Sequence, residues 1–162
     1  DTEVPEASLF GPEPGRVAPH IYHDDEIVEL LAAARTLGPT GSIRPFTYET
    51  LFGLMASTGL RVSEAIHLRD ADVDLKRGML TIRQTKFYKT RILPLTGSVM
   101  AELRAYIDAR RRAGAPQDPR SGLFWHEHFN DRYTPVSVST MITKVMRRAV
   151  QALTEQPEAV AA

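Results

Sequence analysis

The sequence predicts an α+β fold that is mainly helical, with the helices packed against a small three-stranded antiparallel sheet. Four long segments repeat apolar residues at the three- and four-residue spacing of a buried helix face. One stretch, residues 73–95, instead alternates apolar and polar residues, as strands with one buried face do. The length of 162 residues suits one domain with one hydrophobic core.

The N-terminal part predicts a lead-in and then a helix. Residues 1–20 contain four prolines and two glycines without an apolar period, so we expect a linker or a disordered segment. The acidic run 24–26 favours a helix N-terminus, and Gly38-Pro39 ends that helix. Its buried face would contain Ile27, Leu30, Leu31 and Ala34.

A second helix, over residues 46–58, is apolar around most of its circumference and should be central. The residues before it, 40–45, predict a loop, and Gly59 suits the position after its last turn. A short third helix should begin near Val62 and end before Asp70.

The sheet region predicts three strands. Val73 and Leu75 mark the first, and residues 76–78 a turn. Residues 79–83 form the second strand, residues 85–90 the hairpin tip, and residues 91–95 the third strand, where Pro94 suits an end or an edge.

The C-terminal part predicts two more long helices. The first spans residues 97–113 and carries Arg110, Arg111 and Arg112 as its basic end. Residues 123–125 form an apolar, extended anchor on the core, and a last helix covers residues 138–153. Together, residues 21–153 form the domain, and residues 154–162 should be a frayed tail.

The composition excludes several classes of protein. The chain has no cysteine, so disulfides and thiolate metal sites are excluded, and no apolar stretch is long enough to span a membrane. The N-terminus lacks the apolar core of a signal peptide. We therefore expect a cytoplasmic protein without a membrane partner.

Charge is unevenly distributed, although the net charge is zero. Residues 1–60 have a net charge of −6, residues 61–112 have +6, and the remainder is neutral. The basic middle block fits either ordinary solvated surface or a surface for nucleic acid.

Two cations in this block could act together on a phosphodiester. Arg61 lies at the junction of two helices, where its planar guanidinium could bind two phosphate oxygens. Glu64, three residues on, could fix its rotamer by a salt bridge. Lys86, on the hairpin, could donate a proton to a leaving oxygen. Taken singly, each residue fits a solvated surface equally well.

These residues carry a resemblance that no single position does. The run Thr58–Leu68, the Thr85-Lys86 hairpin and the strand from Arg91 to Leu95 resemble, in order and spacing, the first half of a tyrosine recombinase (phage integrase) catalytic domain. The resemblance covers about residues 20–150 and implies DNA integration or recombination.

The resemblance implies a role for each candidate residue. Arg61 would grip the scissile phosphate, supported by Glu64, and Lys86 would be the general acid for the departing 5′ hydroxyl. We expect contacts to backbone phosphates from Lys89, Arg91 and Arg83. The implied partner is double-stranded DNA, with self-association on DNA in the full-length protein and no metal or other cofactor.

The sequence departs from the family pattern in its C-terminal part. It contains no His-x-x-Arg box, and no tyrosine follows Tyr133. Lys144 and Arg147 match a loose form of the box, but the residues between them suit a helix core. We therefore expect a truncated catalytic domain, inactive by itself.

Two alternatives stay open. The chain could be a non-catalytic DNA-binding remnant, or a helix-turn-helix regulator using residues 54–68. The run His126-Glu127-His128 suggests a metal site only weakly, because adjacent residues on a strand cannot all converge on one ion.

Overall fold

The computed structural model describes residues 21–83 and 89–154. The helices are α1 (Asp24–Arg35), α2 (Arg44–Thr58), α3 (Val62–Ile66), α4 (Gly97–Arg112) and α5 (Pro135–Thr154). A 3₁₀ turn, Asp70–Asp72, precedes the strands β1 (Val73–Asp74), β2 (Met79–Ile82) and β3 (Arg91–Pro94), and β4 (Trp125–His126) and β5 (Asp131–Arg132) follow α4. The mainly helical α+β architecture is as the sequence predicts. The predicted lead-in, residues 1–20, and the tail from residue 155 lie outside the described residues.

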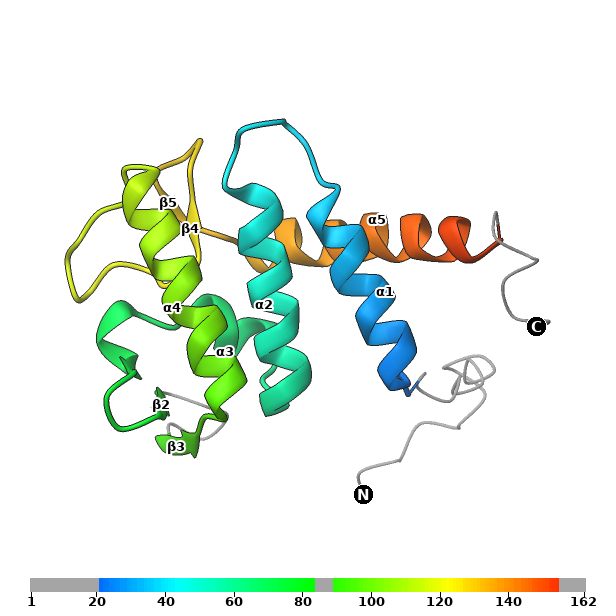
Figure 1. The fold of residues 1–162 in the computed structure, drawn as a ribbon. Coiled ribbons are helices and arrows are strands. Elements are labelled where there is room, and N and C mark those ends of the chain that lie inside the picture. Colours follow the sequence, from blue (N-terminus) through cyan, green and yellow to red (C-terminus); the bar gives the residue numbers. More distant parts are fainter. Residues whose placement is uncertain (1–20, 84–88, 155–162) are drawn as a thin grey trace, which may run out of the picture.

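Helix α2 is the centre of the molecule. In Figure 1, α1, α2 and α4 stand side by side, and α5 runs across α2 and α1 and contacts α1 and α3. Tyr48, Leu51, Phe52 and Leu54 of α2 are almost completely buried. The prediction that this helix is central is therefore confirmed, and its apolar circumference has a partner on each side.

Proline and threonine set the helix boundaries that the sequence placed less accurately. Helix α2 begins at Arg44 rather than at residue 46, because Pro45 lies in its first turn, where its missing N–H costs nothing. Helix α5 likewise begins at Pro135 rather than at residue 138. The Thr134 hydroxyl accepts a hydrogen bond from the Ser137 amide at 3.2 Å, and the Ser137 hydroxyl accepts one from the Thr134 amide at 3.0 Å.

The three-stranded sheet has the order β1-β2-β3, with both pairs antiparallel. Leu80 and Ile82 of β2 are buried and Met79 is exposed, which is the alternation that predicted the strand. The sheet prediction is confirmed. Residues 84–88, including Lys86 and Tyr88, lie outside the described residues.

A second, two-stranded sheet was not expected from the sequence. Strands β4 and β5 pair antiparallel, and the Trp125 indole N–H donates to Asn130 Oδ1 at 3.0 Å across the hairpin. Each strand has two residues, which is too short to produce an alternating pattern. Leu123 and Phe124, just before the hairpin, are fully buried, in agreement with the predicted anchor.

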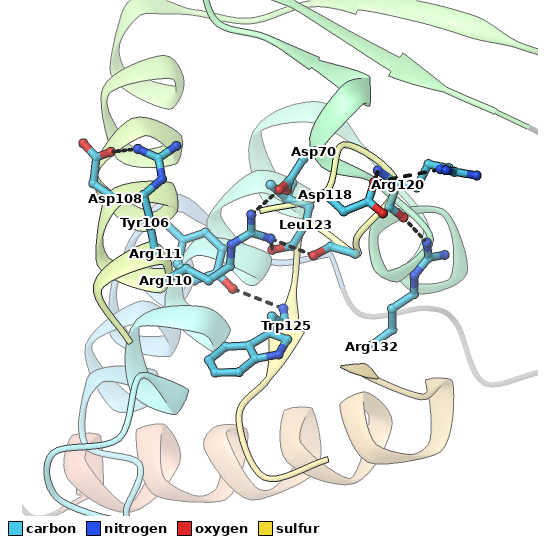
Figure 2. A network of polar contacts seen from close by, with 11 residues as sticks. Asp70, Tyr106, Asp108, Arg110, Arg111, Asp118, Arg120, Leu123, Trp125 and Arg132 are labelled. Carbon is cyan, nitrogen blue, oxygen red and sulfur yellow. Dashed lines mark hydrogen bonds and ion pairs between the residues drawn. The ribbon is translucent and has the colours of Figure 1, made fainter. Parts of the chain in front are cut away.

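Arg110 belongs to the basic end of α4, as predicted, but its side chain is buried in the core. Its guanidinium Nη1 donates to the carbonyls of Gly122 and Leu123 at 2.7 and 2.8 Å, and Nη2 forms an ion pair with Asp70. Figure 2 shows this side chain reaching from α4 between the segment that ends at Trp125 and the turn at Asp70. Arg110 therefore joins three parts of the chain, and its aliphatic stem lies in the core.

We expect Arg110→Met to lower the free energy of unfolding by about 3 kcal/mol, since it removes one partner of a buried ion pair and leaves Asp70 uncompensated. Urea unfolding followed by circular dichroism would measure this change. Arg111→Met is the matched control, because Arg111 is half exposed and should change stability by less than about 0.5 kcal/mol. Equal losses for the two variants would contradict a special role of Arg110.

Candidate functional site

The junction between α2 and α3 holds Arg61 at the surface. Gly59 ends α2 in the left-handed conformation, with φ 67°, as its predicted position requires. Leu60 then turns into the core, and Arg61 becomes the residue that precedes α3 with extended backbone. The Arg61 side chain is 65% exposed, so its guanidinium is available to a ligand.

Glu64 holds Arg61 and Arg91 together. Its carboxylate is 6% exposed and accepts hydrogen bonds from the Arg61 backbone amide and from Arg91 Nη2, each at 3.0 Å. Arg61 Nη1 lies 3.7 Å from its second oxygen, within ion-pair range. One buried carboxylate thus fixes the start of α3, the Arg61 side chain and strand β3 relative to one another.

Asp72, in the 3₁₀ turn that follows α3, repeats this arrangement. Its carboxylate is 3% exposed, accepts a hydrogen bond from the Arg69 backbone amide at 2.9 Å, and accepts one from Arg83 Nε at 2.6 Å. The sequence analysis did not select Asp72 or Arg69. The signal that could have found them is the repeated spacing of an arginine followed three residues later by a carboxylate.

An open pocket of about 810 Å³, which we call the arginine pocket, lies between α3, the 3₁₀ turn and the hairpins. Its lining combines four arginines with the two buried carboxylates and a few other side chains: Arg61, Ser63, Glu64, His67, Leu68, Arg69, Asp72, Arg83, Thr90 and Arg132. Because the arginines outnumber the carboxylates, the pocket favours an anionic ligand.

Only some of the residues selected from the sequence line the arginine pocket. Arg61, Glu64 and Arg83 meet in the arginine pocket. Arg91 binds Glu64 but does not line the pocket, and the exposed Lys89 is not part of the lining either. Lys86 is outside the described residues, but Arg83 and Thr90, on either side of that gap, both line the pocket.

The tyrosines of the described residues do not line the arginine pocket. Burial raises the pKa of Tyr48 and of Tyr106 to about 12, and burial also raises the pKa of Tyr133. Tyr22 is more exposed, and its hydroxyl donates to the Met146 sulfur at 3.2 Å. Three of these four hydroxyls are therefore unsuited to nucleophilic attack, and the fourth is engaged beside α5.

Other candidate sites lie apart from the arginine pocket. His126, Glu127 and His128 line a separate pocket with Arg44 and Tyr133, and burial lowers the pKa of His126. Across residues 21–83 and 89–154, no three His, Asp or Glu side chains are grouped so that they could hold a metal ion. In the same ranges, no helix is both long and apolar enough to cross a membrane.

Comparison with known proteins gives consistent matches. The Phage integrase family model matches residues 21–158. The integrase/recombinase y4rB of Sinorhizobium fredii is 40% identical over 126 residues, which are 76% of this chain and 40% of that protein. Tyrosine recombinase XerC of Chlamydia caviae is 28% identical over 147 residues, which are 91% of this chain and 45% of that protein. The chain thus spans less than half the length of these relatives.

Solved structures agree with the fold. The XerA recombinase crystal structure matches with a TM-score of 0.64 and 25% identity, over 85% of this chain and 46% of that one. XerH, bound to its difH substrate in a pre-cleavage complex, matches in fold with a TM-score of 0.61 and 20% identity, over 81% of this chain and 37% of that one. The family model and the mainly helical fold with its three-stranded sheet agree, and the chain belongs to the phage integrase family of tyrosine recombinases.

Proposed function

We propose that this chain is the part of a site-specific tyrosine recombinase that grips DNA at the scissile phosphate. The observation that carries the proposal is Arg61, exposed at its guanidinium and held by the buried Glu64 at the edge of the arginine pocket. A guanidinium fixed before the ligand arrives stabilises charge that develops on a phosphate without further reorganisation. The DNA-bound XerH structure, which shares the fold, supports DNA as the partner.

The proposed chemistry is a transesterification. A tyrosine oxygen attacks the phosphorus, the bond from phosphorus to the 5′ oxygen breaks, and a 3′-phosphotyrosyl link forms. Arg61 binds the non-bridging oxygens, and Lys86 gives its proton to the departing 5′ oxygen. Glu64 and Arg91 act as positioning residues, since Glu64 accepts a hydrogen bond from the Arg61 amide and Arg91 donates one to Glu64. Arg83 and Lys89 add contacts to backbone phosphates.

We further propose that these 162 residues bind DNA but do not cut it alone. The described tyrosines are buried or engaged elsewhere, and the sequence contains no His-x-x-Arg box. Lys144 and Arg147 lie on exposed positions of α5 and do not line the arginine pocket. The matched regions are 40% and 45% of the lengths of these two relatives, which leaves room for a nucleophile outside the matched region.

The helix-turn-helix alternative is less well supported. Helix α3 has five residues, and Glu64, Ala65 and Ile66 are buried. A recognition helix reads base edges through exposed side chains along a longer stretch. A non-catalytic DNA-binding remnant predicts the same pocket, so the covalent step is what separates it from a recombinase.

Strand cleavage can be tested with a pool of nicked duplexes, randomised in sequence around the nick, that trap a covalent intermediate. We expect no DNA-linked protein band on denaturing gels with the 162-residue chain, because no described tyrosine faces the arginine pocket. A trapped adduct that disappears with one tyrosine-to-phenylalanine change would refute this expectation and identify the nucleophile.

Arg61→Gln should weaken binding to a fluorescent duplex and reduce the slope of log K against log salt concentration by about 0.9, the contribution of one lost phosphate contact. Fluorescence anisotropy between about 50 and 200 mM salt measures both quantities. Arg77→Gln is the control, since Arg77 is 83% exposed in the β1–β2 turn and outside the pocket. Affinity that does not change with salt in the parent protein would defeat the whole electrostatic proposal.

Glu64→Gln should lower the free energy of unfolding by about 1–3 kcal/mol, since Arg91 and the Arg61 amide lose a charged acceptor. It should also reduce the effect of Arg61→Gln on DNA affinity, because Arg61 is no longer held in place. A double-mutant cycle measures this coupling. Glu29→Gln on α1 is the control, because it removes the same negative charge away from the pocket. If the effects of Glu64→Gln and Arg61→Gln on DNA affinity are additive, Glu64 has no positioning role.

A further inference from the structure

We infer that the arginine pocket binds a second backbone phosphate of the same DNA, through Arg69 and Arg132, beside the phosphate at Arg61. The inference rests on the proposed function for the identity of the ligand. It assigns a role to two arginines that line the pocket and that the sequence analysis did not select.

The first observation is the repeated geometry at the two buried carboxylates. Glu64 accepts from the Arg61 backbone amide and from an arginine of β3, and Asp72 accepts from the Arg69 backbone amide and from Arg83, which follows β2. In each case the carboxylate fixes the backbone of the arginine three residues earlier. Arg69 is therefore anchored as Arg61 is, and both residues are exposed and line the same pocket.

The second observation is the position of Arg132 next to Arg69. The backbone of Arg69 forms an antiparallel bridge with Gly122, and the Arg132 side chain packs directly over Gly122. A Cβ atom at residue 122 would lie only 2.5 Å from Arg132 Cγ. Arg132 Nη2 also donates to the Arg120 carbonyl at 3.1 Å, a contact visible in Figure 2. Gly122 thus joins the two arginines, since it pairs with the backbone of Arg69 and leaves room for the side chain of Arg132.

The charges at this end of the pocket favour a phosphate. Among the residues that the structure describes, no carboxylate forms an ion pair with the guanidinium of Arg69 or Arg132. Asp72 is turned into the protein, where it binds Arg83 and a backbone amide. Two guanidinium groups that line one pocket, with no carboxylate ion pair among the described residues, suit a planar, multidentate contact with phosphate oxygens.

DNA supplies such a second phosphate at the right scale. One strand carries a phosphate for about every 3.4 Å of helix axis, so a pocket that extends from α3 to β5 faces more than one of them. A second contact would fix the direction of the strand in the pocket, which a single phosphate contact cannot do.

The test compares Arg69→Gln, Arg61→Gln and the double variant on a fluorescent 16-base-pair duplex of arbitrary sequence, over a salt series. Each single change should lower the salt slope by about 0.9, and the double change by about 1.8. Arg104→Gln is the control, because Arg104 is exposed on α4 and outside the pocket lining. If Arg61→Gln lowers the slope and Arg69→Gln does not, the second phosphate site is wrong and the proposed function stands. If neither change lowers it, both are wrong.

Gly122→Ala provides a test without a change of charge. The added methyl should displace Arg132, so the salt slope should fall as much as in Arg132→Gln, in a protein whose circular dichroism is unchanged. In the Arg132→Gln background, Gly122→Ala should have no further effect on the slope. The role of Arg132 would be overturned if Gly122→Ala lowered the slope further in the Arg132→Gln protein, or if the slope were unchanged in folded Gly122→Ala protein. The Arg69 variants test the site independently.

Discussion

The buried carboxylate of Glu64 is the constraint on which the site depends. A carboxylate that is 6% exposed is costly unless hydrogen bonds satisfy it, and here the donors come from two separated parts of the chain. The Arg61 amide and the Arg91 guanidinium can both reach it only if β3 lies against the start of α3. Both hydrogen bonds end on Oε2 of Glu64, and within the described part of the chain the second oxygen has only the Arg61 guanidinium within ion-pair range. The contacts of this carboxylate therefore hold the sheet against the helical core and contribute to the shape of the arginine pocket.

Two further arginine–carboxylate contacts extend this principle across the molecule. Asp70 and Asp72 belong to one 3₁₀ turn, but Asp70 pairs with the core residue Arg110 and Asp72 with Arg83 at the pocket. The turn is therefore held from both sides. Since Arg110 also binds the carbonyls of Gly122 and Leu123, the core contact positions the glycine over which Arg132 packs. Arg110 thus helps to position the pocket although it is not one of the lining residues.

The sequence predicted what depends on periodicity and missed what depends on tertiary contacts. Helix α2 is apolar around most of its circumference and strand β2 alternates apolar and polar residues, and both were placed within two residues. Arg61 and Glu64 could be selected because they are only three residues apart at the start of a predicted helix, so their contact is local in the sequence. Asp72 repeats the spacing of Glu64, three residues after an arginine, but the sequence pattern shows neither its partner Arg83, eleven residues away, nor its burial, because both come from the fold. The burial of Arg110 was not predicted either, because it depends on contacts with distant parts of the chain, whereas arginine in a helical basic run usually faces solvent.

A neutral protein can still present a strongly basic site, because screening makes charge a local property. At physiological ionic strength charges further apart than about 8 Å are largely screened from one another, so the acidic residues of positions 1–60 matter to the arginine pocket only where they come close to it. Of the described part of that segment, residues 21–60, no side chain lines the pocket. Three of its four arginines belong instead to the basic block of residues 61–112, and the fourth, Arg132, is brought to them by the β4–β5 hairpin. The fold thus brings positive charge together in the pocket although the net charge of the chain is zero. A nearby anionic backbone would therefore interact with the charge of the pocket rather than with the net charge.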